Sequence, residues 1–257
     1  MDTMLVLCLC AFVAGFVDAI AGGGGLIQLP ALFIILPDTP VVTLLAVNKC
    51  AAMCGTLVAT ARYLRSVPVQ WRATLPAAGA AALFSFLGAR TVTLVDPAFL
   101  RPLMLFLLGG AAIYTFFHKD FGLLHAPRLR YASQVWCGMV AGMAIGFYDG
   151  FFGPGTGTFL MLVFVALFGF DFLNAAVSTK IVNLTTNLAA LAFFVAHGHV
   201  VARWALPMAA ANVAGALAGS HMAVLRGSRF MRRIVLAVVV AVIARYAFDI
   251  LKHWYSG

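Results

Sequence analysis

The chain has 257 residues, of which 63% are hydrophobic and 10% are charged, and it carries a net charge of +9. A soluble domain has about 25% charged residues, so this composition excludes a soluble globular protein and predicts a membrane protein. The Lys and Arg residues lie in short gaps between long apolar runs, not on one face or tail, which argues against a nucleic-acid partner.

The apolar runs predict an all-α polytopic membrane protein with eight to ten helical segments. The first run begins with an acid where a secretory signal carries positive charge, so we expect it to be retained. The second and seventh runs are shorter than the roughly 20 residues of a membrane span and follow glycine clusters, which predicts two half-helices. In chain order the expected helices are 3–21, 24–36, 40–62, 71–90, 98–117, 134–152, 155–170, 173–196, 203–224 and 230–251.

Two glycine-rich, acid-bearing stretches interrupt the apolar sequence. GFVDAIAGGGGLIQLP at 15–30 is matched by GFYDGFFGPGTGTFLM at 146–161, at an offset of 131 residues. The same offset relates Lys49 to Lys180, Arg72 to Arg203, Gly88 to Gly219 and Arg101 to Arg232. A constant offset of this length indicates an internal repeat. We therefore expect a first transmembrane repeat at 1–117, a polar linker at 118–133 and a second repeat at 134–257.

The basic residues predict how the repeats sit in the bilayer. If each repeat crosses an odd number of times, ten Lys and Arg residues fall on one side and four on the other, as the positive-inside rule requires. An even number of crossings divides them eight to six. We therefore expect two inverted repeats of about five segments each, with the loop at 62–72 and the linker inside and both termini outside.

The doubled glycine motif, with Asn48 and Lys49 after its first copy, resembles the TauE/SafE family of sulfite-exporter-like membrane permeases. The resemblance covers essentially the whole chain. It implies a multi-pass protein of the bacterial inner membrane that transports small sulfur-containing anions such as sulfite or sulfonates, and it favours export. The second motif departs from the family pattern, because Pro154 and Thr156 stand where many members keep glycine. The choice among these anions is therefore not carried over.

Two lysines also predict an anionic substrate from the residues alone. Lys49 lies nine residues after Pro40, and Lys180 lies nine residues after Asp171. At about 1.5 Å per helical residue, each lysine begins roughly 13 Å into a hydrocarbon core of about 30 Å. An ionisable group at that depth costs about 3 kcal/mol and usually has a function. We expect both lysines to bind the anion.

The glycines and neutral polar residues complete the predicted binding site. A half-helix that begins after a glycine cluster directs its free N–H groups and positive dipole end toward an anion. The same neutral side chains could instead only hold helices together, as Ser, Thr and Asn often do in membranes. The substrate-binding candidates are Gly22, Gly23, Gly24, Gly25, Gly153, Gly155, Thr156, Gln28, Asn48, Thr179, Asn183 and Asn187.

Asp18 and Asp149 occupy matching positions in the two motifs. Intramembrane acids often carry protons in transporters, so both are candidate coupling residues. In the alternative interpretation, Asp18 pairs with Lys49 and Asp149 with Lys180, and each pair only neutralises its own charges.

Nothing in the sequence predicts a cofactor. The cysteines and histidines form no metal-ligand cluster, and no G-x-x-x-x-G-K-[ST] nucleotide loop is present, so we expect secondary transport and not an ATP-driven pump. The expected partners are the bilayer and a small anion, and a homo-oligomer remains open. The alternative class is a membrane-embedded enzyme or assembly factor with a buried polar site, which the lack of a nucleophile–base cluster disfavours.

Overall fold

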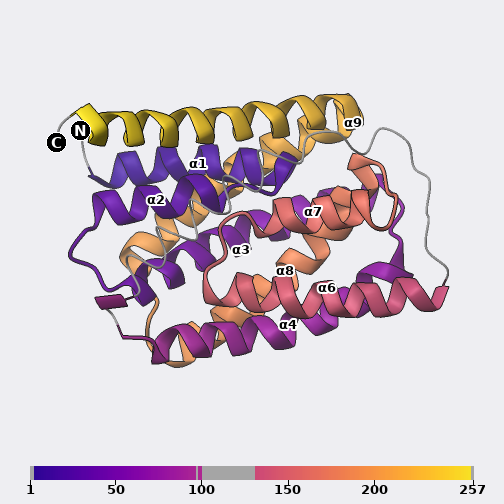
Figure 1. Ribbon diagram of the computed structural model, residues 1–257, viewed down its shortest axis with the longest axis horizontal. Coiled ribbons are helices and arrows are strands. Elements are labelled where there is room, and N and C mark those ends of the chain that lie inside the picture. The colour runs from indigo at the N-terminus through magenta and orange to yellow at the C-terminus, as the bar shows by residue number, and fades with distance from the viewer. Residues whose placement is uncertain (1–2, 97, 100–130, 256–257) are drawn as a thin grey trace.

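The computed structural model describes residues 3–96, 98–99 and 131–255, with the side chains of 131, 228–229 and 231–255 left out. Regular structure in these ranges is helical throughout. The helices are α1 Thr3–Ala21, α2 Gly25–Ile35, α3 Val41–Ser66, α4 Trp71–Leu94, α6 Tyr131–Phe151, α7 Thr156–Ala166, α8 Phe172–Ala196 and α9 Ala202–Tyr255 (Figure 1). The helix expected at 98–117 and the linker at 118–133 fall largely outside the described residues.

The helix lengths confirm the expected all-α multi-pass architecture. Five described helices are long and apolar enough to cross a membrane: α1, α3, α4, α8 and the Ala202–Gly227 part of α9. In contrast, α2 and α7 have 11 residues each, or about 16 Å at 1.5 Å per residue. They are too short to cross a bilayer core of about 30 Å, as expected of half-helices.

Several boundaries differ from the expectation. Helices α3 and α4 continue to Ser66 and Leu94, beyond the expected ends at 62 and 90. Helix α6 begins at Tyr131, inside the predicted linker. Helix α7 ends at Ala166 and not at residue 170, because the chain turns through Gly169, whose φ is +78°. Helix α9 joins two expected segments through a kink at Gly227, where φ is +66° and ψ is −167°. Glycine permits that positive φ without a steric penalty.

Helices α3 and α8 cross the middle of the molecule in opposite directions. Near the start of α3, Lys49 donates a hydrogen bond to Asn187, near the end of α8. Toward the end of α3, Thr60 donates to the backbone carbonyl of Lys180, near the start of α8. Because rising residue numbers on one helix meet falling numbers on the other, the two helices are antiparallel.

The contacts outside this central pair also recur at the offset of 131. A Cβ built on Gly88 of α4 would lie 2.2 Å from the carbonyl oxygen of Phe147 on α6. A Cβ built on the equivalent Gly219 of α9 would lie 2.4 Å from the carbonyl oxygen of Phe16 on α1. Each repeat therefore packs its fourth helix on the first helix of the other repeat. Figure 1 shows α1 with α9 along one edge and α4 with α6 along the opposite edge.

Glycines bring the helices of these outer pairs into backbone contact. Four glycines on α6 are spaced four residues apart, and a Cβ on any of them would lie between 1.8 and 2.8 Å from a backbone atom of α4. Such spacing of small residues is typical of close helix packing in membranes. In order, Gly138, Gly142, Gly146 and Gly150 approach Ala73, Ala77, Ala81 and Ser85. This packing fixes α1 and α6, the two helices that carry the motif aspartates.

Candidate functional site

The two glycine breaks meet inside the protein. A Cβ on Gly22, whose φ is +73°, would lie 2.3 Å from the backbone carbon of Gly157, and a Cβ on Gly157 would lie 2.6 Å from Cα of Gly22. A Cβ on Gly25 would lie 3.0 Å from Cα of Pro154. The breaks after α1 and α6 are therefore in backbone contact, and the N-terminal ends of α2 and α7 lie together. Helix N-termini carry partial positive charge, so this arrangement attracts an anion.

Two buried ion pairs connect the repeats. Nζ of Lys49 on α3 lies 2.5 Å from Oδ2 of Asp149 on α6. Nζ of Lys180 on α8 lies 2.6 Å from Oδ2 of Asp18 on α1. Both lysines and Asp149 are at least 97% buried, whereas the Asp18 side chain is 16% exposed. The sequence therefore identified the four buried charges near the glycine breaks.

The pairing itself differs from the alternative interpretation. That interpretation joined Lys49 to Asp18 and Lys180 to Asp149, within each repeat, and it is wrong about the partners. Each lysine instead pairs with the aspartate of the opposite repeat. The cause is the packing of the helices, since α1 and α6 each lie against the fourth helix of the other repeat.

The two ion pairs have different surroundings. Lys49 also donates a hydrogen bond of 3.1 Å to Oδ1 of Asn187, whose own amide nitrogen lies 3.4 Å from Oδ1 of Asn183. The predicted asparagines of α8 thus lie at Lys49, although they follow Lys180 in sequence. Lys180 donates instead to the backbone carbonyl of Asp18 as well as to its carboxylate. At the offset of 131, Thr56 is the equivalent of Asn187. Its Oγ1 lies 3.5 Å from Oδ2 of Asp18.

Two buried oxygens at equivalent positions have no hydrogen-bond partner among the described residues. They are Oδ1 of Asn48 and Oγ1 of Thr179, each one residue before a motif lysine. Asn48 is 4% exposed and Thr179 is fully buried. A buried polar atom without a partner costs about 1–3 kcal/mol. The Thr179 hydroxyl can donate a hydrogen bond to a ligand, whereas the amide oxygen of Asn48 can only accept one. Both residues were candidates from the sequence.

Hydrogen bonds between amide groups connect α9, α2 and α3. The first of these residues, Asn212, was not predicted from the sequence. Asn212 donates a hydrogen bond of 2.9 Å to Oε1 of Gln28, whose Nε2 lies 3.4 Å from the backbone carbonyl oxygen of Asn48. All three residues are buried. An asparagine in the middle of the segment 203–224, which was expected to span the membrane, was the available signal. At the offset of 131, the equivalents of Asn212, Gln28 and Asn48 are Ala81, Phe159 and Thr179, so these hydrogen bonds exist on one side of the site only.

The glycines of the second break lie beside the Lys49 pair. A Cβ on Gly153, whose φ is +99°, would lie 3.2 Å from Nζ of Lys49. Gly155 precedes α7 with φ of +83°. The hydroxyl of Thr156 donates to the carbonyl of Gly153 at 2.7 Å, so it stabilises the turn. These conformations favour glycine, and the backbone of this break approaches the lysine closely.

The glycines of the first break have a comparable place beside Asp18. A Cβ on Gly24 would lie 2.6 Å from Cβ of Asp18. The carbonyl of Gly23 accepts a hydrogen bond of 3.1 Å from the backbone N–H of Leu26. Of the predicted glycines, Gly24 therefore lies next to the Lys180–Asp18 pair, and Gly153 lies next to the Lys49–Asp149 pair.

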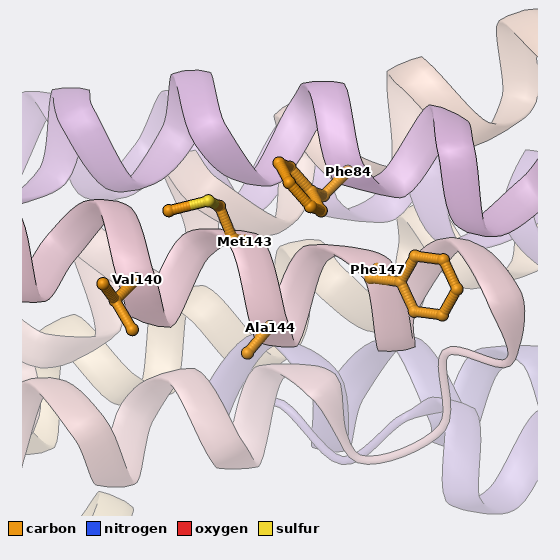
Figure 2. Close-up of a pocket in the computed structure, with 5 residues that line it drawn as sticks. All are labelled: Phe84, Val140, Met143, Ala144 and Phe147. Atoms are coloured by element: carbon orange, nitrogen blue, oxygen red, sulfur yellow. The ribbon is translucent and has the colours of Figure 1, made fainter.

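A surface groove between α4 and α6 lies apart from these charges. Its volume is about 440 Å³, and Figure 2 shows its lining: Phe84, Val140, Met143, Ala144 and Phe147. Val140 and Phe147 are exposed. An apolar surface of this kind matches lipid hydrocarbon and offers an anion no hydrogen bond from these side chains.

Comparison with known proteins gives one consistent relationship. The sulfite exporter TauE/SafE family matches residues 7–246. The chain is 34% identical over 254 residues to a probable membrane transporter protein of Haemophilus influenzae, an alignment that covers 99% of this chain and 97% of the relative. It is 36% identical over 243 residues to the probable membrane transporter protein ORF9 of a Sinorhizobium species, covering 95% and 92%. No solved structure matches the chain.

A third relative is the probable membrane transporter protein YfcA of Escherichia coli, which is 31% identical over 253 residues, covering 97% of this chain and 93% of the relative. With its apolar helices, the chain fits a multi-pass protein of the bacterial inner membrane. The chain belongs to the sulfite exporter TauE/SafE family of membrane transporters.

Proposed function

We propose that the protein is a secondary transporter that exports small sulfur-containing anions, such as sulfite or a sulfonate. One observation carries the proposal: two buried lysines lie at a pair of broken helices whose N-termini meet, and the buried hydroxyl of Thr179, one residue before Lys180, has no hydrogen-bond partner among the described residues. Lysine, a hydroxyl or amide and helix N-termini are the groups that bind oxyanions. The name of the matched family supports sulfite as the first substrate to test.

The helix directions support alternating access by two inverted repeats. The antiparallel crossing of α3 and α8, which occupy equivalent places in the two repeats, is what an approximate two-fold axis in the membrane plane requires. In Figure 1, α1 begins and α9 ends at the same end of the molecule. Movement of one repeat against the other would then open the central site to each side in turn.

The ion pairs give each charged residue a role. In the substrate-free arrangement, Asp149 neutralises Lys49 and Asp18 neutralises Lys180. A proton on either aspartate frees the opposite lysine, whose ammonium group then faces the anion. We assign Lys49 and Lys180 to anion binding, Asp18 and Asp149 to proton coupling, and the Thr179 hydroxyl and the Asn48 amide N–H group to recognition of the oxyanion.

The proposal is tested by flux into proteoliposomes that contain the purified chain. We expect accumulation of ³⁵S-labelled sulfite or of a labelled sulfonate under an inward proton gradient, and none in protein-free vesicles. If no sulfur oxyanion crosses while the folded protein is present, the proposed function is wrong. Chromatography of the recovered label distinguishes the enzyme alternative, because an enzyme returns a chemically altered anion and a transporter returns the same one.

A further inference from the structure

The buried charges of the site sum to zero, and this balance restricts what the site can bind. Among the described residues, the charged side chains buried in the protein are Lys49, Asp149 and Lys180, and Asp18 completes the second pair. Each pair is neutral, so the cluster of these four side chains carries no net charge.

An anion that enters this cluster alone leaves an uncompensated negative charge in a low-dielectric interior. The effective penalty for one such ion is several kcal/mol after relaxation, which would prevent useful affinity. A proton bound at Oδ2 of Asp149 removes this penalty. The carboxyl group becomes neutral, Lys49 keeps its positive charge, and the anion takes the place of the carboxylate, so the cluster remains neutral throughout.

The other titratable neighbours are already engaged. Tyr63 of α3, near Asp18, donates its phenolic hydrogen to the carbonyl of Ala19 at 2.8 Å. Tyr148 of α6, near Asp149, donates to the carbonyl of Pro154 at 2.6 Å. Neither phenol is placed to supply the compensating proton. The proton must therefore come from the aqueous side, with the anion.

The two aspartates differ in how far solvent reaches them. The Asp18 side chain is 16% exposed, whereas the Asp149 side chain is 2% exposed. In this conformation the proton reaches Asp18 first, which frees Lys180 on the opposite repeat. If the two repeats exchanged conformations, Asp149 would become exposed in the same way as Asp18 is here.

Resting on the proposed function, we infer that the protein moves each anion with one proton per unit of its negative charge, so that transport is electroneutral. The neutral Lys49–Asp149 and Lys180–Asp18 cluster imposes this ratio. The co-substrate is a proton, and the transported sum of anion and protons carries no charge. Transport should therefore follow a pH gradient and ignore the membrane potential.

The ratio of protons to anion charge can be measured in proteoliposomes that contain the wild-type chain. The transported anion is methanesulfonate, which carries no titratable proton of its own. Valinomycin and potassium gradients set a potential of 100 mV at equal pH, and a pH gradient is set separately at zero potential. A single moving charge is worth about 2.3 kcal/mol per 100 mV, or about 50-fold in accumulation. We expect less than twofold from the potential and a large effect of the pH gradient. Potential-driven accumulation near 50-fold overturns the inference and leaves the proposed function standing.

Proton uptake by the solubilised protein gives an independent measurement. Methanesulfonate is added to the wild type in detergent and weak buffer, and we expect one proton taken up per anion bound. Binding without proton uptake overturns the inference, whereas no binding or flux of any sulfur oxyanion instead overturns the proposed function. With Asp18→Asn and Asp149→Asn combined, proton uptake should disappear, and with Asp38→Asn, an exposed acid, it should remain.

Discussion

The exchange of ion-pair partners between repeats predicts which double substitution restores stability. Lys49→Met leaves the 98% buried Asp149 carboxylate without its partner at 2.5 Å. Removing one member of a buried ion pair costs about 3–5 kcal/mol, whereas replacing both by apolar residues is often neutral. We therefore expect Lys49→Met to destabilise the protein strongly, and Lys49→Met combined with Asp149→Leu to recover most of the loss.

The coupling energy of this cycle should be several kcal/mol. A chain of this size loses about 2–4 °C in Tm per kcal/mol, so the single substitution should lower Tm by about 6–20 °C. Unfolding in detergent can be followed with a thiol-reactive fluorophore, because all five cysteines are free.

The matched control is the cycle of Lys49→Met with Asp18→Leu, which joins residues of the same repeat. We expect a small coupling energy there, since Asp18 is paired with Lys180. If the Lys49 and Asp18 substitutions rescue each other and the Lys49 and Asp149 substitutions do not, the exchanged pairing is refuted. Transport by the Lys49→Met, Asp149→Leu protein should remain absent, because the anion has lost a cation. Full transport would contradict the role of Lys49.

Gly22→Ala should destabilise the protein by about 1–3 kcal/mol more than Gly198→Ala, because both glycines have φ near +72° but only Gly22 contacts backbone, that of Gly157; equal Tm losses would contradict this. Asn212→Ala should weaken anion binding about tenfold, because Gln28 loses the donor at 2.9 Å that orients its amide; unchanged affinity in titrations would exclude that positioning role. Cysteines introduced at Gln70 and Gly227 should react with impermeant thiol reagents only from the cytoplasm, and one at His199 only from outside; labelling of all three from one side would contradict inverted repeats.

The hydropathy and the repeat predicted most of the fold, because both are local properties of the chain. The half-helices α2 and α7 follow from apolar runs too short to span, and the offset of 131 identified equivalent positions without any knowledge of their contacts. Helix rise alone predicted that the two lysines lie deep in the bilayer, and the structure shows that both are buried in the protein. The end of α7 was missed because the apolar run continues through Leu167, Phe168 and Phe170, although Gly169, where the chain turns, was an available stop signal.

The partner of each lysine could not be predicted in the same way. Lys49 is 31 residues from Asp18 and 100 from Asp149, and sequence distance favours the nearer acid. The choice is decided by which helix each repeat places against the other, and this depends on packing along the glycines of α6 and α9. Asn212 was missed for a related reason: only the tertiary contact with Gln28 distinguishes it from an asparagine that joins two helices.

An ion pair between the two repeats couples protonation of its aspartate to movement of one repeat against the other. An ion pair within one repeat would move with that repeat and stay intact. This argument requires that the repeats move relative to each other, and one contact tests it directly. Thr74 on α4 and Ser178 on α8 belong to different repeats, and their hydroxyl oxygens are 2.8 Å apart. With Thr74→Cys and Ser178→Cys, the two sulfur atoms should lie close enough to form a disulfide on oxidation. We expect oxidation to stop anion flux and a reductant to restore it, with each single cysteine variant as the control for the five native thiols. Undiminished flux in fully cross-linked protein would mean that α4 and α8 do not separate during transport. The two lysines would then leave their aspartates for the anion without movement between these helices.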